Sequence, residues 1–560
     1  MSTQYTVNSY LLDRLKELGI RHIFGVPGDY AFPLMDRMET TEDISWIGNC
    51  NELNGAYAAD GYARIHGIGA FVVTCGVGEL SAACGVAGAY NDQVPLIAIV
   101  GHPPKEGVKT GLTTHHGLRG DFSGFARIYK EFTVAQALLT PENACQEIDR
   151  VFEACWSEKL PVYVQLPRDV GDLPAQPPTA KLALSEPVSD PKQLTVFLES
   201  LLPLLSAAQR PAMLVDVWVG SFHLTELVES FASKSGIPFA ATPAAKSAFL
   251  DETHPQYLGT YPGEIEGNAV SQQIKEADLL LRLAIHYDET NTGRAAFNLR
   301  SPEVVNLQIN SAAIGESDYP NLRLRDVLMQ LNEKVDHREF AFSKQARTTS
   351  VAFEPQHDTP ITQERLWQRF GHFLQSDDVL VIDQGMCFGA TMVTIPAGAR
   401  IVTLGSWGAI GYALPAVLGA HLADNSRRHL LVLGDGAFQM TAQELSTILR
   451  HELNPIIILL HNNRYEIENV YRLDGYKEMH YNELQSWNYH QLLMDFAQTQ
   501  EPLGLKVTTE SELETAFTKA AQAQTEGRCV LIEVILAPND VPSYVADSFN
   551  IGLERQRNSK

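Results

Sequence analysis

Cysteine is scarce in this chain of 560 residues. Its seven cysteines are odd in number and scattered, and they form no CxxC pair. Proteins organised by disulfides or by zinc need paired or closely spaced cysteines. We therefore expect neither a disulfide framework nor a zinc site.

The sequence also has no long apolar run and no excess of positive charge. No apolar stretch reaches the roughly 20 residues that span a bilayer. Charged residues interrupt the apolar positions of the first 20 residues, which predicts an amphipathic helix and not a secretion signal. The 67 acidic and 43 basic residues give a formal net charge of −24, which argues against coating nucleic acid or adsorbing to acidic membranes. We expect a soluble cytoplasmic enzyme with no nucleic-acid and no membrane partner.

The chain does contain enough apolar material for several domains. Hydrophobic residues make up 45% of it and charged residues 20%, as in globular proteins. Stretches without periodicity and with several prolines, at 172–193 and 343–362, divide it. The remaining segments alternate short apolar strands with helical stretches, which predicts an α/β protein of three domains, each a mostly parallel sheet flanked by helices. We place these domains at 1–180, 193–342 and 360–560.

The first and last segments share an outline. In each, a strand runs into a GxG turn, a helix follows, and a proline precedes the next strand, at 69–101 and 428–463. This indicates only a weak internal repeat, because any βαβ unit can produce it. The middle segment has no GxGxxG after a strand, so we expect no dinucleotide site there.

The strongest local motif is a GDG sequence that is followed, 27 positions after its aspartate, by Asn462. Asp435 leaves a strand at its carboxyl end, and a right-handed crossover would place Asn462 beside it at the same sheet edge. A carboxylate, an amide oxygen and a backbone carbonyl suit Mg²⁺, and glycine turns let N–H groups approach phosphate oxygens. An ordinary glycine turn with an unrelated asparagine is the alternative.

The stretch after the GDG motif predicts a helix. Thr441 and Glu444 have the spacing of a capping box, which marks a helix start. We expect this helix to run to about Leu453.

With GDG and the later asparagine, the chain resembles thiamine-diphosphate-dependent enzymes. The resemblance covers nearly the whole chain and is greatest to the 2-oxo acid decarboxylases that act on pyruvate, indolepyruvate, phenylpyruvate or branched-chain oxo acids. Five further motifs occur in the order typical of that group: FGVPGDY (24–30), NELNGAYAADGYAR (51–64), GVGELSA (76–82), PVYVQLPRDV (161–170) and WGAIGYALPA (407–416).

The resemblance implies an architecture and a reaction. The three domains would be a pyrimidine-binding, a central and a diphosphate-binding domain, with the active site between two subunits. The assembly would be a homodimer at least, with a homotetramer expected. Thiamine diphosphate and Mg²⁺ would serve as cofactors, since decarboxylation of a 2-oxo acid needs an electron sink. An enamine on the cofactor would then be protonated and released as an aldehyde.

The same resemblance makes Glu52 the acid that activates the cofactor at its pyrimidine N1′. Its position at a helix start alone would indicate only that the acid stabilises the helix through the helix dipole, by about 0.3 to 1 kcal/mol. The Gly408 carbonyl would hold the N4′ amino group, and Ile410 would be the apolar wedge that folds the cofactor. The small residues after Glu52 would pack against a neighbouring subunit. Further cofactor contacts are expected at Gln384, Met386, Gly434, Gly436 and Ala437.

Adjacent histidines, His115 and His116, distinguish this chain within the superfamily. Two imidazoles can exchange protons near neutral pH, although paired histidines on a surface are also common. Asp29 and Glu468 match family positions and complete a set suited to protonating the intermediate. Carboligases that resemble acetolactate synthase typically have no such pair, so simple decarboxylation is favoured. A catalytically silent cofactor-binding subunit is a second alternative, which these four residues argue against.

Two stretches depart from the family pattern. Arg464 stands where a glycine usually offers its carbonyl as the third metal ligand, which a side chain permits if the backbone angles do not require glycine. Met386 and Cys387 stand where small hydroxyl residues are usual. The preferred oxo acid therefore stays open, with the substrate pocket expected at Phe388, Ile467 and Tyr471.

Overall fold

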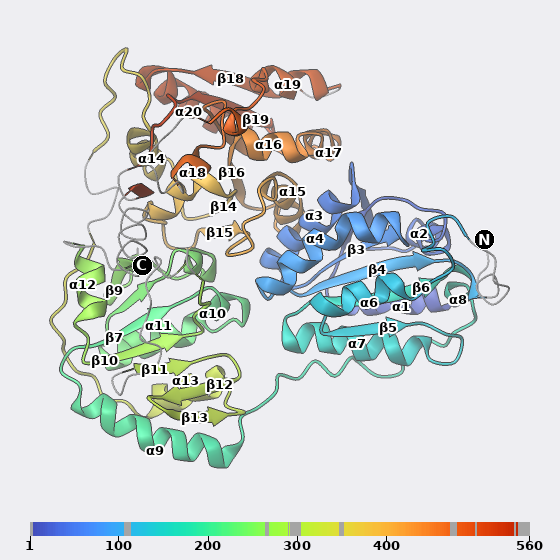
Figure 1. Ribbon diagram of the computed structural model, residues 1–560, viewed down its shortest axis with the longest axis horizontal. Helices are drawn as coiled ribbons and strands as arrows, with labels where there is room; N and C mark the ends of the chain where they lie inside the picture. Colours follow the sequence, from blue (N-terminus) through green and yellow to red (C-terminus); the bar gives the residue numbers. More distant parts are fainter. Residues whose placement is uncertain are drawn as a thin grey trace.

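The computed structural model describes most of the chain and divides it into three sheets (Figure 1). The described residues are 4–105, 114–261, 263, 268–288, 291, 304–345, 352–470, 479–498, 501–542 and 545–546. One sheet lies within each predicted segment, which confirms the prediction of an α/β fold with three mostly parallel sheets flanked by helices, while the domain boundaries at 1–180, 193–342 and 360–560 stay predictions.

The first domain is a six-stranded parallel sheet of order β2-β1-β3-β4-β6-β5. Its central strands β3 and β4 are buried on both faces, which explains their unbroken apolar sequences. The strands are β1 (His22–Gly25), β2 (Ser45–Gly48), β3 (Gly69–Thr74), β4 (Leu96–His102), β5 (Ala135–Leu138) and β6 (Val162–Pro167). The helices are α1 (Val7–Glu17), α2 (Phe32–Met38), α3 (Glu52–His66), α4 (Val77–Asn91), α6 (Gly124–Tyr129), α7 (Ala144–Glu158) and α8 (Arg168–Gly171), with the 3-10 turn η1 (Lys130–Phe132).

The third domain repeats this topology. Its parallel sheet has the order β15-β14-β16-β17-β19-β18, which is the first domain's order strand for strand and confirms the internal repeat. The strands are β14 (Asp378–Ile382), β15 (Arg400–Thr403), β16 (Arg428–Gly434), β17 (Ile456–His461), β18 (Leu503–Val507) and β19 (Val530–Ile535). The helices are α14 (Gln363–Gly371), α15 (Ala413–Ala423), α16 (Asp435–Thr441), α17 (Glu444–Arg450), α18 (Glu466–Val470), α19 (Tyr489–Phe496) and α20 (Glu510–Thr525), with 3-10 segments η4 (Gly385–Met392) and η5 (His480–Asn482).

The middle domain has a different, mixed sheet of order β13-β12-β11-β10-β7-β8-β9, in which β11, β12 and β13 pair antiparallel. The strands are β7 (Pro211–Val215), β8 (Phe239–Ala241), β9 (Tyr257–Thr260), β10 (Leu279–Leu283), β11 (Val304–Leu307), β12 (Ser311–Ile314) and β13 (Ser317–Pro320). The helices are α9 (Pro191–Ala207), α10 (Trp218–Ser221), α11 (Thr225–Ser235), α12 (Ala269–Lys275) and α13 (Leu324–Lys334), with the 3-10 turn η2 (Ala244–Ala248).

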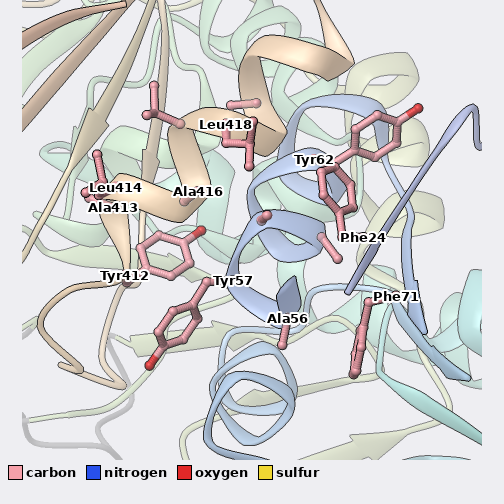
Figure 2. Close-up of a cluster of buried hydrophobic side chains, with 14 of the residues drawn as sticks. Phe24, Ala56, Tyr57, Tyr62, Phe71, Tyr412, Ala413, Leu414, Ala416 and Leu418 are labelled. Atoms are coloured by element: carbon pink, nitrogen blue, oxygen red, sulfur yellow. The ribbon is translucent and has the colours of Figure 1, made fainter. Parts of the chain in front are cut away.

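Helices α3 and α15 join the first and third domains of the same chain (Figures 1 and 2). A Cβ added at Gly61 of α3 would lie 2.2 Å from the Ala416 carbonyl oxygen, and one at Gly419 of α15 would lie 1.8 Å from that of Ala58. The small residues after Glu52 therefore pack within the chain, and the expectation that they meet a neighbouring subunit was wrong. The pattern of small residues indicates close packing but does not identify the partner helix.

The helix predicted from Thr441 to about Leu453 is confirmed in part, because α17 runs from Glu444 to Arg450 inside this range. The predicted start at Thr441 was wrong, since Thr441 is the last residue of the preceding helix α16, which begins at Asp435. The Thr441 hydroxyl does not cap α17, because it donates to the Gly411 carbonyl at 2.8 Å. A tertiary contact thus uses the group that the sequence assigned to a capping box.

Two further observations concern the length of the helices and the state of the cysteines. Throughout the described ranges, no helix is long and apolar enough to cross a membrane. All seven cysteines are free thiols.

Candidate functional site

The carboxyl ends of β16 and β17 bring Asp435 and Asn462 together. Asp435 follows directly on β16, and its Oδ2 accepts hydrogen bonds from the backbone N–H of Asn462 (3.2 Å) and of Asn463 (2.7 Å). Its Oδ1 accepts from the Gly436 N–H at 2.9 Å. The predicted juxtaposition at one sheet edge is confirmed.

The Asp435 carboxylate is 2% exposed. In the described part of the chain, no lysine or arginine forms an ion pair with it, and burial raises its pKa to about 6. A buried carboxylate without a cation is costly, and a bound divalent ion would offset that cost. The donor set therefore fits a hard cation such as Mg²⁺.

The backbone around this carboxylate suits a bound diphosphate. A Cβ added at Gly434 would meet no atom within 4 Å, whereas one at Gly436 would lie 2.4 Å from the Tyr465 ring, so Gly436 must be glycine. Gly436 and Ala437 are buried in the first turn of α16, where backbone N–H groups point out of the helix start.

Arg464 is compatible with its predicted role as a backbone ligand. The left-handed conformation falls on Asn463, with φ of 60°, and not on Arg464. The Arg464 N–H donates to Asn462 Oδ1 at 3.2 Å, which keeps the two residues in one turn. A side chain at position 464 therefore costs no backbone strain.

A second buried acid, Asp383, holds the loop in which Gly408 and Ile410 lie. Asp383 follows β14 and accepts from the N–H groups of Gly411 (3.2 Å) and Ala413 (2.9 Å), and its burial raises its pKa to about 6. Gly408 is exposed with φ of 69°, and Ile410 packs against the core between α3 and α15. The sequence analysis missed Asp383, although an acid directly after an apolar strand is the signal that identified Asp435.

The predicted pocket residues lie around η4 and α18. Gln384 is half-buried, and its amide donates to the Leu404 carbonyl at 3.4 Å, while Met386 and Cys387 are buried in the core of the third domain. Phe388 and Ile467 are half-buried. Tyr471 lies outside the described residues. The roles of these residues stay predictions.

Glu52 is the first residue of α3, as predicted. Asn51 caps the helix, and its side chain accepts from the Asn54 N–H at 2.9 Å. The Glu52 side chain is half-buried, and its Oε1 lies 3.5 Å from the position of a Cβ added at Gly78 of α4. Asn51, and not Glu52, therefore caps α3, and the Glu52 side chain faces the start of α4.

The third domain holds the start of α3 through Glu444. This fully buried carboxylate accepts from the side-chain amides of Asn49 (2.8 Å) and Asn54 (2.6 Å) and from the Cys50 N–H (3.3 Å). The sequence analysis missed this contact, because it depends on how two domains pack. Glu444 thereby fixes the turn that presents Glu52.

Asp29 and both histidines form a cluster at the carboxyl end of the first sheet. His115 Nε2 lies 3.3 Å from Asp29 Oδ1, and His115 Nδ1 lies 3.1 Å from the Tyr30 hydroxyl. The His115 ring stacks on Tyr30 at 4.8 Å between centroids and meets the His116 ring at 4.5 Å. Tyr30 is a member of the cluster that the sequence analysis missed.

Glu468 does not join this cluster within the chain. It lies on α18 of the third domain and is exposed. Between the described atoms of Glu468 and the two histidines there is neither a hydrogen bond nor an ion pair. Three of the four predicted acid and base residues are therefore brought together, and the fourth is not.

Comparison with known proteins matches all three domains. Residues 5–126 match the family model described as thiamine pyrophosphate enzyme, N-terminal TPP binding domain, residues 198–328 match its central domain, and residues 383–534 match its C-terminal TPP binding domain. An alpha-keto-acid decarboxylase of Mycobacterium leprae (strain TN) is 36% identical over 548 residues, which cover 97% of this chain and 94% of that protein. A pyruvate decarboxylase of Aspergillus fumigatus is 34% identical over 551 residues, with 96% and 95% covered.

Proposed function

Because this chain belongs to the thiamine-diphosphate-dependent 2-oxo acid decarboxylase family, we propose that it converts a 2-oxo acid to an aldehyde and CO2 at a site shared by two subunits. The observation that carries this proposal is the cluster of Asp29, His115 and His116, in which His115 Nε2 lies 3.3 Å from the Asp29 carboxylate and the two imidazole rings meet at 4.5 Å between centroids. A protein that only binds the cofactor would not need this cluster.

The residues of the third domain would hold the cofactor. Asp435, Asn462 and the backbone carbonyl of Arg464 would bind Mg²⁺, and the burial of Asp435, with no described lysine or arginine paired to it, supports this role. When bound, thiamine diphosphate supplies the ring that takes up the electrons left by CO2. The remaining contacts would be Gly434, Gly436, Ala437, Gln384 and Met386, with Gly408 and Ile410 at the pyrimidine ring.

The residues of the first domain would move protons. Glu52 would hold a proton at the pyrimidine N1′, and its position outside the capping contacts of α3 supports this role. His115, whose Nε2 contacts Asp29, and His116 would deliver a proton to the carbon that loses CO2. Protonation gives an aldehyde, whereas a carboligase would join that carbon to a second oxo acid. Glu468 would complete the set.

A homodimer would bring Glu468 to the histidine cluster. One side of α4 supports this assembly, because Val77, Leu80 and Tyr90 are exposed apolar side chains, 55%, 44% and 39% exposed. Cys84 is exposed on the same helix, and the start of this helix lies next to the Glu52 carboxylate. We propose a homodimer at least and a homotetramer as the full assembly, which light scattering coupled to gel filtration would measure.

The proposed compartment is the cytoplasm, in keeping with seven free thiols. The negative net charge of −24 supports a function without nucleic acid or membrane.

A coupled assay tests the proposed function and ranks the substrates. Aldehyde release is followed with alcohol dehydrogenase and NADH over pyruvate, 4-methyl-2-oxopentanoate, phenylpyruvate and indolepyruvate. We expect release from at least one acid. The absence of aldehyde from all four, despite bound cofactor, would contradict the proposal and favour the silent subunit, while 2-acetolactate from pyruvate would favour the carboligase. Phe388, Ile467 and Tyr471 are the positions to vary once a substrate is known.

A further inference from the structure

Glu79 is a buried acid for which the proposed reaction has no use. It lies in the first turn of α4 and is 0% exposed. Its Oε1 accepts from the Gly76 N–H at 2.7 Å, and its Oε2 accepts from the Tyr163 hydroxyl at 2.9 Å. The Tyr129 hydroxyl donates to the Glu79 carbonyl at 2.5 Å. Glu79 is therefore fixed on three sides.

The groups that face this carboxyl include no cation. They are Tyr163, Tyr129 and Cys75, and no described lysine or arginine pairs with it. Burial raises the pKa of Glu79 to about 7. A glutamate that only caps a helix can stay in solvent without this penalty. Glu512 does so in α20, where its exposed carboxylate accepts from the Thr508 N–H at 2.7 Å.

The partner of Glu79, Gly76, supports the backbone of the histidine pair. Gly76 has φ of 70° and ψ of −97°, and a Cβ added to it would lie 2.3 Å from the His116 carbonyl oxygen and 3.0 Å from the His116 Cβ. His116 itself has φ of 66°. The turn at Gly76 is thus the surface on which His116 rests, and only glycine leaves room for it.

We propose that Glu79 is a positioning residue for His115 and His116. Its carboxyl group sets the conformation of Gly76, Gly76 sets the place of the His116 backbone, and the imidazoles are thereby held at the proton-transfer distance from the product carbon. This inference rests on the proposed function, because it assigns the pair a proton to deliver.

Two variants separate the reach of the side chain from its charge. Glu79→Gln keeps an oxygen at the distance of the Gly76 N–H, so we expect kcat within about threefold of the parent enzyme. Glu79→Asp keeps the acid but withdraws it by one methylene, so we expect kcat to fall at least tenfold with KM changed less than threefold. The pH dependence of kcat should shift for Glu79→Asp, because misplaced imidazoles titrate differently.

The product ratio provides a readout that loss of stability alone would not change. With added benzaldehyde, the carbon that loses CO2 can bond to the benzaldehyde carbonyl carbon instead of taking a proton; the C=O π electrons move to the benzaldehyde oxygen, which takes the proton and becomes the hydroxyl of an acyloin. Slower proton delivery in Glu79→Asp should raise the ratio of acyloin to aldehyde. The matched variants Glu512→Asp and Glu512→Gln alter a capping glutamate far from the pair, and both should leave kcat, pH profile and product ratio unchanged.

A measurement without cofactor keeps the test independent of turnover. In protein labelled with ¹³C at histidine Cε1, the signals of His115 and His116 should move in Glu79→Asp and stay in Glu79→Gln. Unmoved signals and an unchanged kcat in a folded Glu79→Asp protein would overturn the proposal, as would Gln and Asp variants that are equally impaired. If the parent and the Glu512 variants release no aldehyde, the proposed function has failed, and the histidine signals still decide the role of Glu79.

Discussion

The first and third domains share one sheet topology but present different chemistry at the ends of their strands. After β16 and β17 the third domain places Asp435 and Asn462, whose side-chain oxygens accept hydrogen bonds from backbone N–H groups. After β3, the strand equivalent to β16, the first domain places the Gly76 turn, on which the histidine pair rests. The shared topology fixes where a site can lie, and the side chains of the loops decide what it does.

Both domains nevertheless contain buried acids that accept hydrogen bonds from the backbone of a turn near the site. Glu79 in the first domain and Asp383 and Asp435 in the third are buried acids that pair with no lysine or arginine among the described residues, and burial raises their pKa values to about 7, 6 and 6. Each accepts from backbone N–H groups of a turn near the site. The proposed roles differ: Glu79 and Asp383 would fix loops, whereas Asp435 would bind a metal ion.

The largest expected effect concerns Glu52, the proposed proton-holding acid of the first domain. Glu52→Gln should lower kcat at least 100-fold, because the amide cannot hold a proton at N1′ as a carboxyl group does. Circular dichroism and the melting temperature should be unchanged, since Glu52 makes no capping contact. Near-normal turnover would show that Glu52 is only a helix-start residue. The Glu512→Gln enzyme serves as the control for a glutamate lost at a helix start.

The second-largest expected effect concerns the proposed metal and cofactor site of the third domain. Asp435→Ala should lose thiamine diphosphate on dialysis in the presence of Mg²⁺, measured by fluorescence after oxidation to thiochrome diphosphate. The cofactor-free protein should stay folded, because the loss of the hydrogen bonds from the Asn462 and Asn463 N–H groups is offset by removal of a buried carboxylate that pairs with no described lysine or arginine. Retention equal to that of the parent protein would contradict the metal assignment. Asp383→Asn is the matched variant, which should disturb the Gly411 loop but leave Mg²⁺ dependence in place.

The third prediction concerns the contact between the two domains. Glu444→Ala leaves the amides of Asn49 and Asn54 and the Cys50 N–H without their acceptor. An unsatisfied buried donor costs about 1–3 kcal/mol, so we expect the free energy of unfolding, measured in urea, to fall by about 2–3 kcal/mol. The kcat should fall as well, because Glu52 loses its support. Loss of stability with unchanged kcat would restrict Glu444 to a structural role.

The sequence predicts the parts of this comparison that depend on local pattern. Alternating strands and helices predict the three sheets, and the spacing of Asp435 and Asn462 predicts their meeting, because a βαβ crossover has one hand. No local sequence pattern predicts the contacts between domains. The small residues of α3 do not identify α15 as their partner. Thr441 and Glu444 have the spacing of a capping box, but the Thr441 hydroxyl donates to Gly411 within its own domain and the Glu444 carboxylate accepts from Asn49 of the first domain.

The smallest effect near neutral pH concerns a feature found in the third domain. His421 and His429 stack at 4.1 Å between ring centroids, and burial lowers their pKa values to about 4 and about 3. In the unfolded chain an imidazole takes up a proton near pH 6.5. As the pH falls from 7 to 5.5, the unfolded state therefore gains protons that the folded state does not bind, and stability is lost.

Replacing both histidines by leucine should remove this component of the pH dependence. Because the buried acids titrate in the opposite sense, the informative quantity is the difference between the variant and the parent in urea unfolding at pH 7 and at pH 5.5. We expect the variant to lose about 1 kcal/mol less per histidine over this interval. His480→Gln, which alters an exposed histidine, should change nothing. Equal pH dependence in all three proteins would mean that the buried pair takes up protons without unfolding.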